Sequence, residues 1–149
     1  MKLEEEIQQK KFKSEKQKAI LNIYYTNCFI TSKIESILSE FALTPQQYNI
    51  LRILRGQKGK VLSVGEIKDR MLDKNSDVSR IIERLRIKNL IERKINRKNR
   101  RQMEVKITSY GLDYISRIDV MEKKFDKILL NLSIKDAEHL NTLLDKIRG

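Results

Sequence analysis

The sequence predicts a mainly α-helical protein with one small β-hairpin, and three observations support this fold class. Apolar residues recur at steps of three and four over most of the 149 residues, which is the spacing of amphipathic helices. This period changes to the alternation typical of β-strands in two short runs, 90–95 and 103–107. The chain has one proline and five glycines, so no flexible linker divides it.

The stretch 74–108 holds a helix followed by the hairpin. The helix has an apolar stripe made of Val78, Ile81, Ile82 and Leu85. Asn75 and Ser76 precede the stripe, and we expect them to cap the first turn. The two strands are joined by the polar turn 96–102, whose two asparagines tolerate left-handed backbone. A helix followed by a hairpin with a cationic tip is the layout of a winged helix.

Positive charge is concentrated on this unit. The formal net charge is +12, and residues 80–101 carry ten Lys and Arg against two Glu, which is +8 of that total. Charge gathered on one helix and hairpin indicates a polyanionic partner, and we expect double-stranded DNA.

Helices with long apolar seams flank the winged helix. The first seam comprises Ile20, Ile23, Asn27, Ile30, Ile34, Ile37 and Phe41. Asn27 either fixes the register of a helix pair or faces a wet gap. The second seam, over residues 112–132, predicts one long helix, and a last helix follows Ser133. Residues 1–19 are expected to form a frayed or extended helical start.

The middle of the chain cannot cover both seams, so we expect a homodimer. The predicted parts are an N-terminal dimerisation helix (1–42), a winged helix-turn-helix DNA-binding domain (43–110) and C-terminal dimerisation helices (111–149). Within the middle, Thr44 and Pro45 begin a helix that Gly56 ends, a minimal strand is expected over 60–62, and Ser63 caps a helix over 64–72.

Other classes of protein lack support in the sequence. The single cysteine excludes an internal disulfide and is consistent with a reducing cytosol. No apolar run approaches the roughly 20 residues of a membrane span, and the N-terminus lacks the apolar core of a signal peptide, so we expect a cytoplasmic location. No Cys/His cluster, glycine-rich phosphate loop or catalytic set is present. We expect neither a cofactor nor a metal, and no enzyme activity.

Four segments in order resemble the multiple-antibiotic-resistance regulator (MarR) family of bacterial transcription factors. They are 43–51 (LTPQQYNIL), 77–85 (DVSRIIERL), 89–93 (NLIER) and 106–111 (KITSYG). The resemblance implies a dimeric winged-helix regulator, usually a repressor, whose DNA binding is commonly relieved by a small ligand or by oxidation. The family usually has Asp-Arg-Arg in the wing where this chain has Asn99-Arg100-Arg101. The resemblance assigns the minor-groove contact to Arg101 first and to Arg100 second.

Candidate DNA-binding residues come from the helix and the hairpin tip. They are Asn75, Ser76, Asp77, Ser79, Arg80 and Arg84 for the major groove, and Lys98, Arg100 and Arg101 for phosphates or a narrow minor groove. Arg80 can donate two hydrogen bonds to guanine, which gives about 1–3 kcal/mol of discrimination. The alternative is a solvated helix face on which Arg80 lies near Glu83.

Two further hypotheses concern the region where the first two long helices meet. Tyr24, Asn27, Cys28, Tyr48 and Arg52 could converge on a pocket for a small-molecule effector, or they could be plain core packing. Cys28 could be a single-cysteine redox sensor, but no Lys, Arg or His lies one helical turn before it to depress its pKa. A buried, inert cysteine is the expected state.

Two functional classes therefore compete. The first is a sequence-specific dimeric regulator that binds a pseudo-palindromic operator. The second is an architectural or RNA-associated winged-helix protein that uses the same charge without reading bases.

Overall fold

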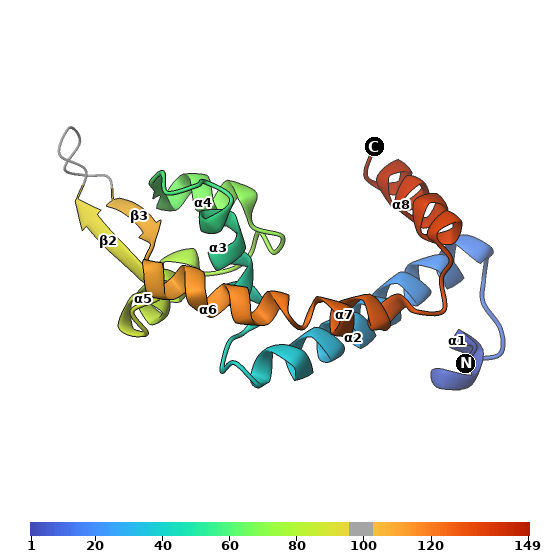
Figure 1. Ribbon diagram of the computed structural model, residues 1–149. Helices are drawn as coiled ribbons and strands as arrows, with labels where there is room; N and C mark the ends of the chain where they lie inside the picture. The colour runs from blue at the N-terminus through green and yellow to red at the C-terminus, as the bar shows by residue number, and fades with distance from the viewer. Residues whose placement is uncertain (96–102) are drawn as a thin grey trace.

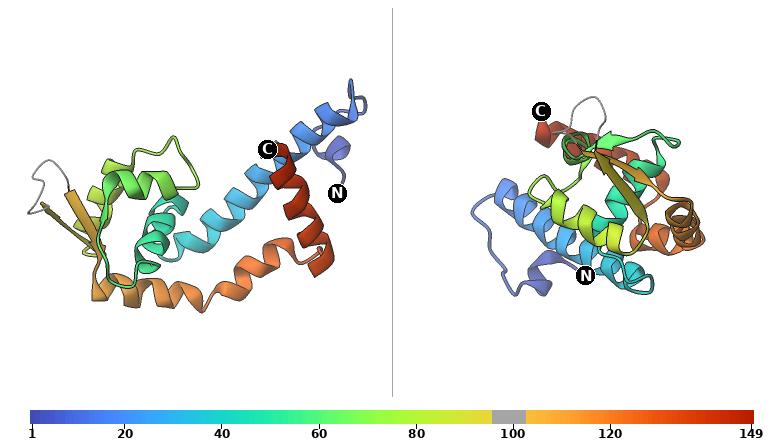
Figure 2. Two further views of the ribbon diagram at one scale, coloured as in Figure 1. Left: turned by 90° about the horizontal axis from the view of Figure 1, so that it is seen from above. Right: turned by 90° about the vertical axis from the view of Figure 1, so that its left-hand side faces the viewer.

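The computed structural model describes residues 1–95 and 103–149 and confirms a mainly α-helical fold with a small β-sheet. A lobe at one end of the molecule contains α3 (Pro45–Arg55), α4 (Val64–Arg70), α5 (Val78–Ile87) and the sheet. From this lobe α2 (Glu15–Ser39), α6 (Ser109–Asp119) and α7 (Glu122–Asp126) extend toward α8 (Ile134–Arg148) and both chain termini (Figures 1 and 2).

The N-terminal segment folds back on α2, which corrects the expectation of a frayed start. A short helix, α1 (Leu3–Glu6), has Leu3 buried. Glu4 forms an ion pair with Lys18 at 2.5 Å, and the Tyr25 hydroxyl donates to the Glu6 carboxylate at 2.6 Å. The segment has few apolar residues to bury, so its sequence alone does not indicate this fold. The contacts with distant positions on α2 hold it in place.

The sheet has three antiparallel strands in the order β1-β3-β2. Strand β1 (Leu62–Ser63) begins later than expected, and β2 (Ile91–Ile95) pairs with β3 (Met103–Ile107) in a register that places Arg93 opposite Val105. The β2–β3 hairpin is the wing. Val105 is fully buried, so Arg93, which lies opposite it, is on the core face of the wing.

The caps of α3 and α4 follow the sequence prediction. Thr44 and Ser63 each accept a hydrogen bond from the third helical N–H, and the side-chain oxygens of Gln47 and Glu66 accept one from the backbone N–H of the cap residue. Helix α4 ends at Arg70 instead of Leu72, because Met71 is extended with its side chain buried.

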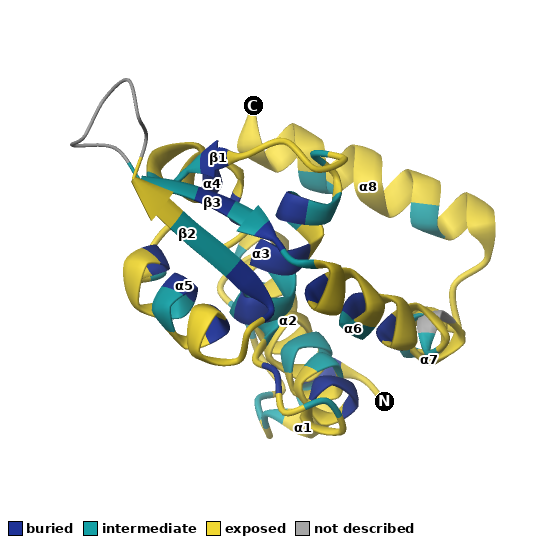
Figure 3. Ribbon diagram, turned by 60° about the vertical axis from the view of Figure 1, so that its left-hand side comes forward, coloured by how far each residue is buried: buried dark blue, intermediate teal, exposed yellow. Residues whose placement is uncertain are grey.

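The hydrophobic core lies in the lobe, between the sheet and the helices around it (Figure 3). Its fully buried side chains include Leu38, Ile50, Leu51, Ile67, Ile82, Leu85 and Ile115. Burial of each such side chain contributes about 1.5–3 kcal/mol to stability. The lobe can therefore hold α5 rigidly.

The expected single helix over 112–132 is wrong, because the chain bends after α6. The Met121 N–H donates to the Ile118 carbonyl at 2.8 Å, a tighter bond than that of an α-helix. Beyond Ile118, Phe125 still packs against the core, but the seam residues Met121 and Ile128 are only half-buried and Leu132 is 37% exposed. Beyond Ile118 the seam is therefore only partly covered by other residues of the same chain, and such packing is what would keep the helix continuous. A 3-10 helix, η1 (Lys127–Leu129), follows α7.

Helix α8 has no buried residue, although its apolar positions have helical spacing (Figure 3). Leu140, Leu143 and Ile147 are 39%, 45% and 66% exposed. Within residues 1–95 and 103–149, no helix is both long and apolar enough to cross a membrane.

Candidate nucleic-acid interface

Helix α5 has one buried and one exposed face. Val78, Ile82 and Leu85 enter the core, whereas Ser79, Arg80 and Arg84 are exposed. Arg80 and Arg84 are one helical turn apart, so their guanidinium groups share a surface. In the part of the chain that the structure describes, neither side chain has a hydrogen bond or ion pair. This face can therefore donate to a ligand without first breaking contacts.

The cap of α5 is Asp77, which corrects the expectation that Asn75 and Ser76 fill this role. The Asp77 carboxylate accepts a hydrogen bond from the Arg80 N–H at 3.1 Å. Asn75 and Ser76 instead bind Asp73. Its carboxylate accepts hydrogen bonds from the Asn75 N–H at 3.0 Å and from the Ser76 hydroxyl at 2.9 Å. Of the predicted major-groove residues, Asp77 thus has a structural partner, and Ser76 has its orientation fixed.

Glu83 pairs with Arg86 rather than with Arg80 or Arg84. The Arg86 Nε and Nη2 atoms donate to the two carboxylate oxygens at 3.0 and 2.7 Å. These hydrogen bonds lower the pKa of Glu83, and the charges of Arg86 and Arg93 act in the same direction. The alternative of a salt-bridged face therefore applies to Arg86 but does not engage the two predicted base-reading arginines.

The wing projects from the lobe beside α5 (Figure 1). Lys94 forms an ion pair with Glu92 at 3.0 Å on its outer face. On the inner face, the Arg93 Nε is buried and has no hydrogen-bond partner among the described residues. Lys98, Arg100 and Arg101, the predicted tip contacts, lie outside the described residues.

The base of the wing is fastened to the end of α5. Thr108 Oγ1 donates to the Asn89 carbonyl at 2.8 Å and accepts from the Gly111 N–H at 2.9 Å. The Thr108 N–H donates to the Leu90 carbonyl at 3.1 Å. The end of α5, the wing and the start of α6 therefore form one unit.

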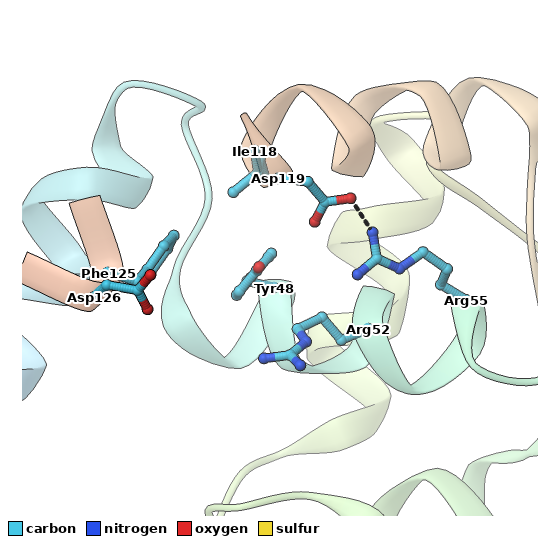
Figure 4. A pocket seen from close by; sticks show the side chains of 7 residues that line it. All are labelled: Tyr48, Arg52, Arg55, Ile118, Asp119, Phe125 and Asp126. Atoms are coloured by element: carbon cyan, nitrogen blue, oxygen red, sulfur yellow. Dashed lines mark hydrogen bonds and ion pairs between the residues drawn. The ribbon is translucent and has the colours of Figure 1, made fainter. Parts of the chain in front are cut away.

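A cavity of about 270 Å³ lies where α3, α6 and α7 meet (Figure 4). Tyr48 stacks on Phe125 with ring centroids 6.0 Å apart, and the Arg52 guanidinium lies 5.9 Å from the Tyr48 ring. Arg55 closes one side through an ion pair with Asp119 at 2.5 Å. Ile118 and Asp126 complete the lining.

The structure brings only two of the five predicted pocket residues, Tyr48 and Arg52, to this cavity. Tyr24, Asn27 and Cys28 are exposed on α2 and do not line it. Cys28 is thus not buried in the single chain. Residues of α6 and α7, and none of α2, line the cavity beside α3.

The described residues contain no group of three or more His, Cys, Asp or Glu side chains that could hold a metal ion.

Comparisons with known proteins point to one family. Residues 43–102 match the model of the MarR family. The chain is 26% identical over 123 residues to the HTH-type transcriptional regulator PapX of Escherichia coli, covering 79% of this chain and 75% of that protein.

Two solved structures are similar to the fold. The MarR transcription factor of Planctomyces limnophilus is 30% identical, with a TM-score of 0.71 over 91% of this chain and 98% of that one. A mutant MarR from Escherichia coli, complexed with operator DNA, is 23% identical, with a TM-score of 0.76 over 85% and 91% of the two chains. The winged helix-turn-helix prediction is therefore confirmed.

Proposed function

Because the chain belongs to the MarR family of transcriptional regulators, we propose that it represses transcription by binding a pseudo-palindromic operator as a homodimer. Members of this family are regulators rather than enzymes. Helix α5 would read bases in the major groove, and the wing would contact the neighbouring minor groove.

The observation that carries this proposal is the exposed face of α5. Arg80 and Arg84 are exposed and unpaired in the described part of the chain, and Ser79 lies beside them. Ser76 and Asn75 precede the helix on the turn that Asp73 organises. In the sequence, the basic residues Lys98, Arg100 and Arg101 follow this helix and add to its positive charge.

The terminal helices support the homodimer. Ile20, Tyr24 and Ile147 are 67%, 70% and 66% exposed, although they occupy apolar seam positions or lie next to them. A second copy that covers α2 and α8 would remove this surface from water. Residues 1–42 and 111–149 would then form the dimerisation part, and 43–110 the DNA-binding part.

The cavity between α3, α6 and α7 supports release by a small effector. It is lined by stacked aromatic rings and by the guanidinium groups of Arg52 and Arg55. An occupant would contact both the DNA-binding lobe and the helices that we assign to the dimer. Its binding could therefore change how the two parts are oriented.

Selection of bound sequences from random DNA tests the proposal. We expect enrichment of a palindrome whose half-sites lie about one helical turn, roughly 10 base pairs, apart. The selected site should bind about a thousandfold more tightly than random DNA at the same salt concentration. Equal affinity for both would contradict the proposal and favour an architectural or RNA-associated protein.

A further inference from the structure

Side chains from three different elements bind the short turn between α2 and α3. Lys124 of α7 forms an ion pair with Glu40 at 2.7 Å. Tyr114 of α6 donates from its hydroxyl to the Phe41 carbonyl at 2.6 Å. Lys88, which directly follows α5, donates to the Ala42 carbonyl. Three consecutive residues are thus attached to elements that lie 46 to 84 positions further along the chain.

The turn itself has a fixed and strained conformation. Ala42 has a φ of +48°, a left-handed value that favours glycine. The Leu43 N–H donates to the Leu38 carbonyl at 3.2 Å, and the Ala42 N–H donates to the Ser39 carbonyl at 3.0 Å, which ends α2 tightly. Leu43 is buried in the core. The direction of α2 is therefore set at this turn.

Lys88 and Tyr114 belong to the unit that presents DNA-reading residues. Lys88 follows the last turn of α5. Tyr114 lies on α6, whose first turn is fastened to the end of α5 through Thr108 and Gly111. The Tyr114 ring also packs edge-on against Phe41, with centroids 6.5 Å apart. Both donors thus connect this unit to the end of α2.

We propose that Tyr114 and Lys88 are positioning residues, which set the angle between α5 and α2 through the carbonyls of Phe41 and Ala42. The proposal rests on the proposed function, because α2 belongs to the dimerising part and α5 reads the DNA. In a dimer, this angle sets the separation of the two α5 helices, and hence the half-site spacing that the protein accepts. The base preference within each half-site belongs to other residues, Arg80 and Arg84.

The test measures binding to the selected palindrome with its spacer unchanged, one base pair longer or one shorter. A one-base-pair change should weaken wild-type binding by about tenfold or more, equivalent to about 1.4 kcal/mol. In Tyr114→Phe, Lys88→Met and the double variant, we expect this penalty to fall below about threefold. Lys88→Arg keeps a cationic donor and should retain the wild-type profile, as should Lys60→Met, which removes the same charge from an exposed position outside the terminal helices.

A second measurement needs no operator. Spin labels placed at Ser79→Cys in a Cys28→Ser background report the distance between the two α5 helices of a dimer. We expect a narrow distribution in the otherwise unchanged protein and a broader or shifted one with Tyr114→Phe and Lys88→Met. Unchanged spacer penalties and distances in the double variant would overturn the inference. A protein that selects no palindrome at all would instead contradict the proposed function.

Discussion

A Cβ atom at Gly111 would lie 2.1 Å from the carbonyl oxygen of Leu90. The contact joins the first turn of α6 to the start of the wing, where Thr108 already holds both segments. Since the neighbour is backbone, it cannot move aside as a flexible side chain would. The absence of a side chain at residue 111 is therefore what lets the wing and α6 meet.

Gly111→Ala should destabilise the protein by about 2–3 kcal/mol, because the added methyl group forces the backbone apart. Chemical denaturation measures the change. Gly65→Ala is the matched control, since a Cβ there meets only Ser63 Oγ at 3.9 Å. The control lies in α4 and should be neutral or up to about 1 kcal/mol more stable. Equal effects of the two substitutions would show that the close contact does not constrain the fold.

Asp77→Ala should cost about 1 kcal/mol of stability, because the cap of α5 is lost. Asp77→Ser keeps an acceptor and should recover most of that loss. If Asp77 acts only as a cap, Asp77→Ser should leave the base preference of the protein unchanged. A changed preference in this variant would instead assign the carboxylate to DNA recognition.

Local sequence determined much of this fold. The caps Thr44 and Ser63, the apolar stripe of α5 and the wing strands were all predicted, because each depends on residues a few positions apart. The cap of α5 was not, since Asn75, Ser76 and Asp77 are all favourable cap residues and only the competing acceptor Asp73 separates them.

The errors concern contacts between distant segments. The seam over 112–132 continues through the bend after Ile118, so its spacing could not reveal a break that depends on missing packing. The cavity combines Tyr48 with Phe125, and Arg55 with Asp119, 64 positions apart. No local pattern joins these residues. Nor does any local pattern pair Lys88 with the Ala42 carbonyl, 46 positions away.

Arg80→Ala should relax the preference for one base pair in each half-site, at a cost of about 1–3 kcal/mol. Arg86→Ala removes the same charge from the same helix, but its guanidinium is already bound by Glu83. We therefore expect Arg86→Ala to keep the base preference. Selection from random DNA with each variant measures the difference. A relaxed preference in Arg86→Ala alone would show that Arg86, and not Arg80, recognises the base.

The carboxylate of Glu66 should make stability depend on pH. Hydrogen bonds from the Ser63 backbone N–H at 2.8 Å and hydroxyl at 2.7 Å lower the pKa of Glu66 from 4.5. The unfolded chain therefore binds this proton more readily, so the contribution is complete above pH 4.5 and is lost as the pH falls through the folded pKa. Denaturation between pH 6 and 3 should show a smaller decline in Glu66→Gln than in the wild type. Parallel declines would contradict this role.

The exposed apolar face of α8 should determine the oligomeric state. Leu143→Asp places a charge on a face that is unpaired in the single chain and that we expect a second copy to cover. Because α8 contributes no buried residue to the core, the lobe should stay folded while the dimer dissociates. Val61→Asp is the control, since Val61 has the same 45% exposure as Leu143 but lies outside the terminal helices. Sedimentation equilibrium should give one copy for Leu143→Asp and two for the control, and operator affinity should fall with dissociation. If the wild-type protein sedimented as a single copy, the apolar seams would not mediate self-association. That result would contradict the proposed homodimer.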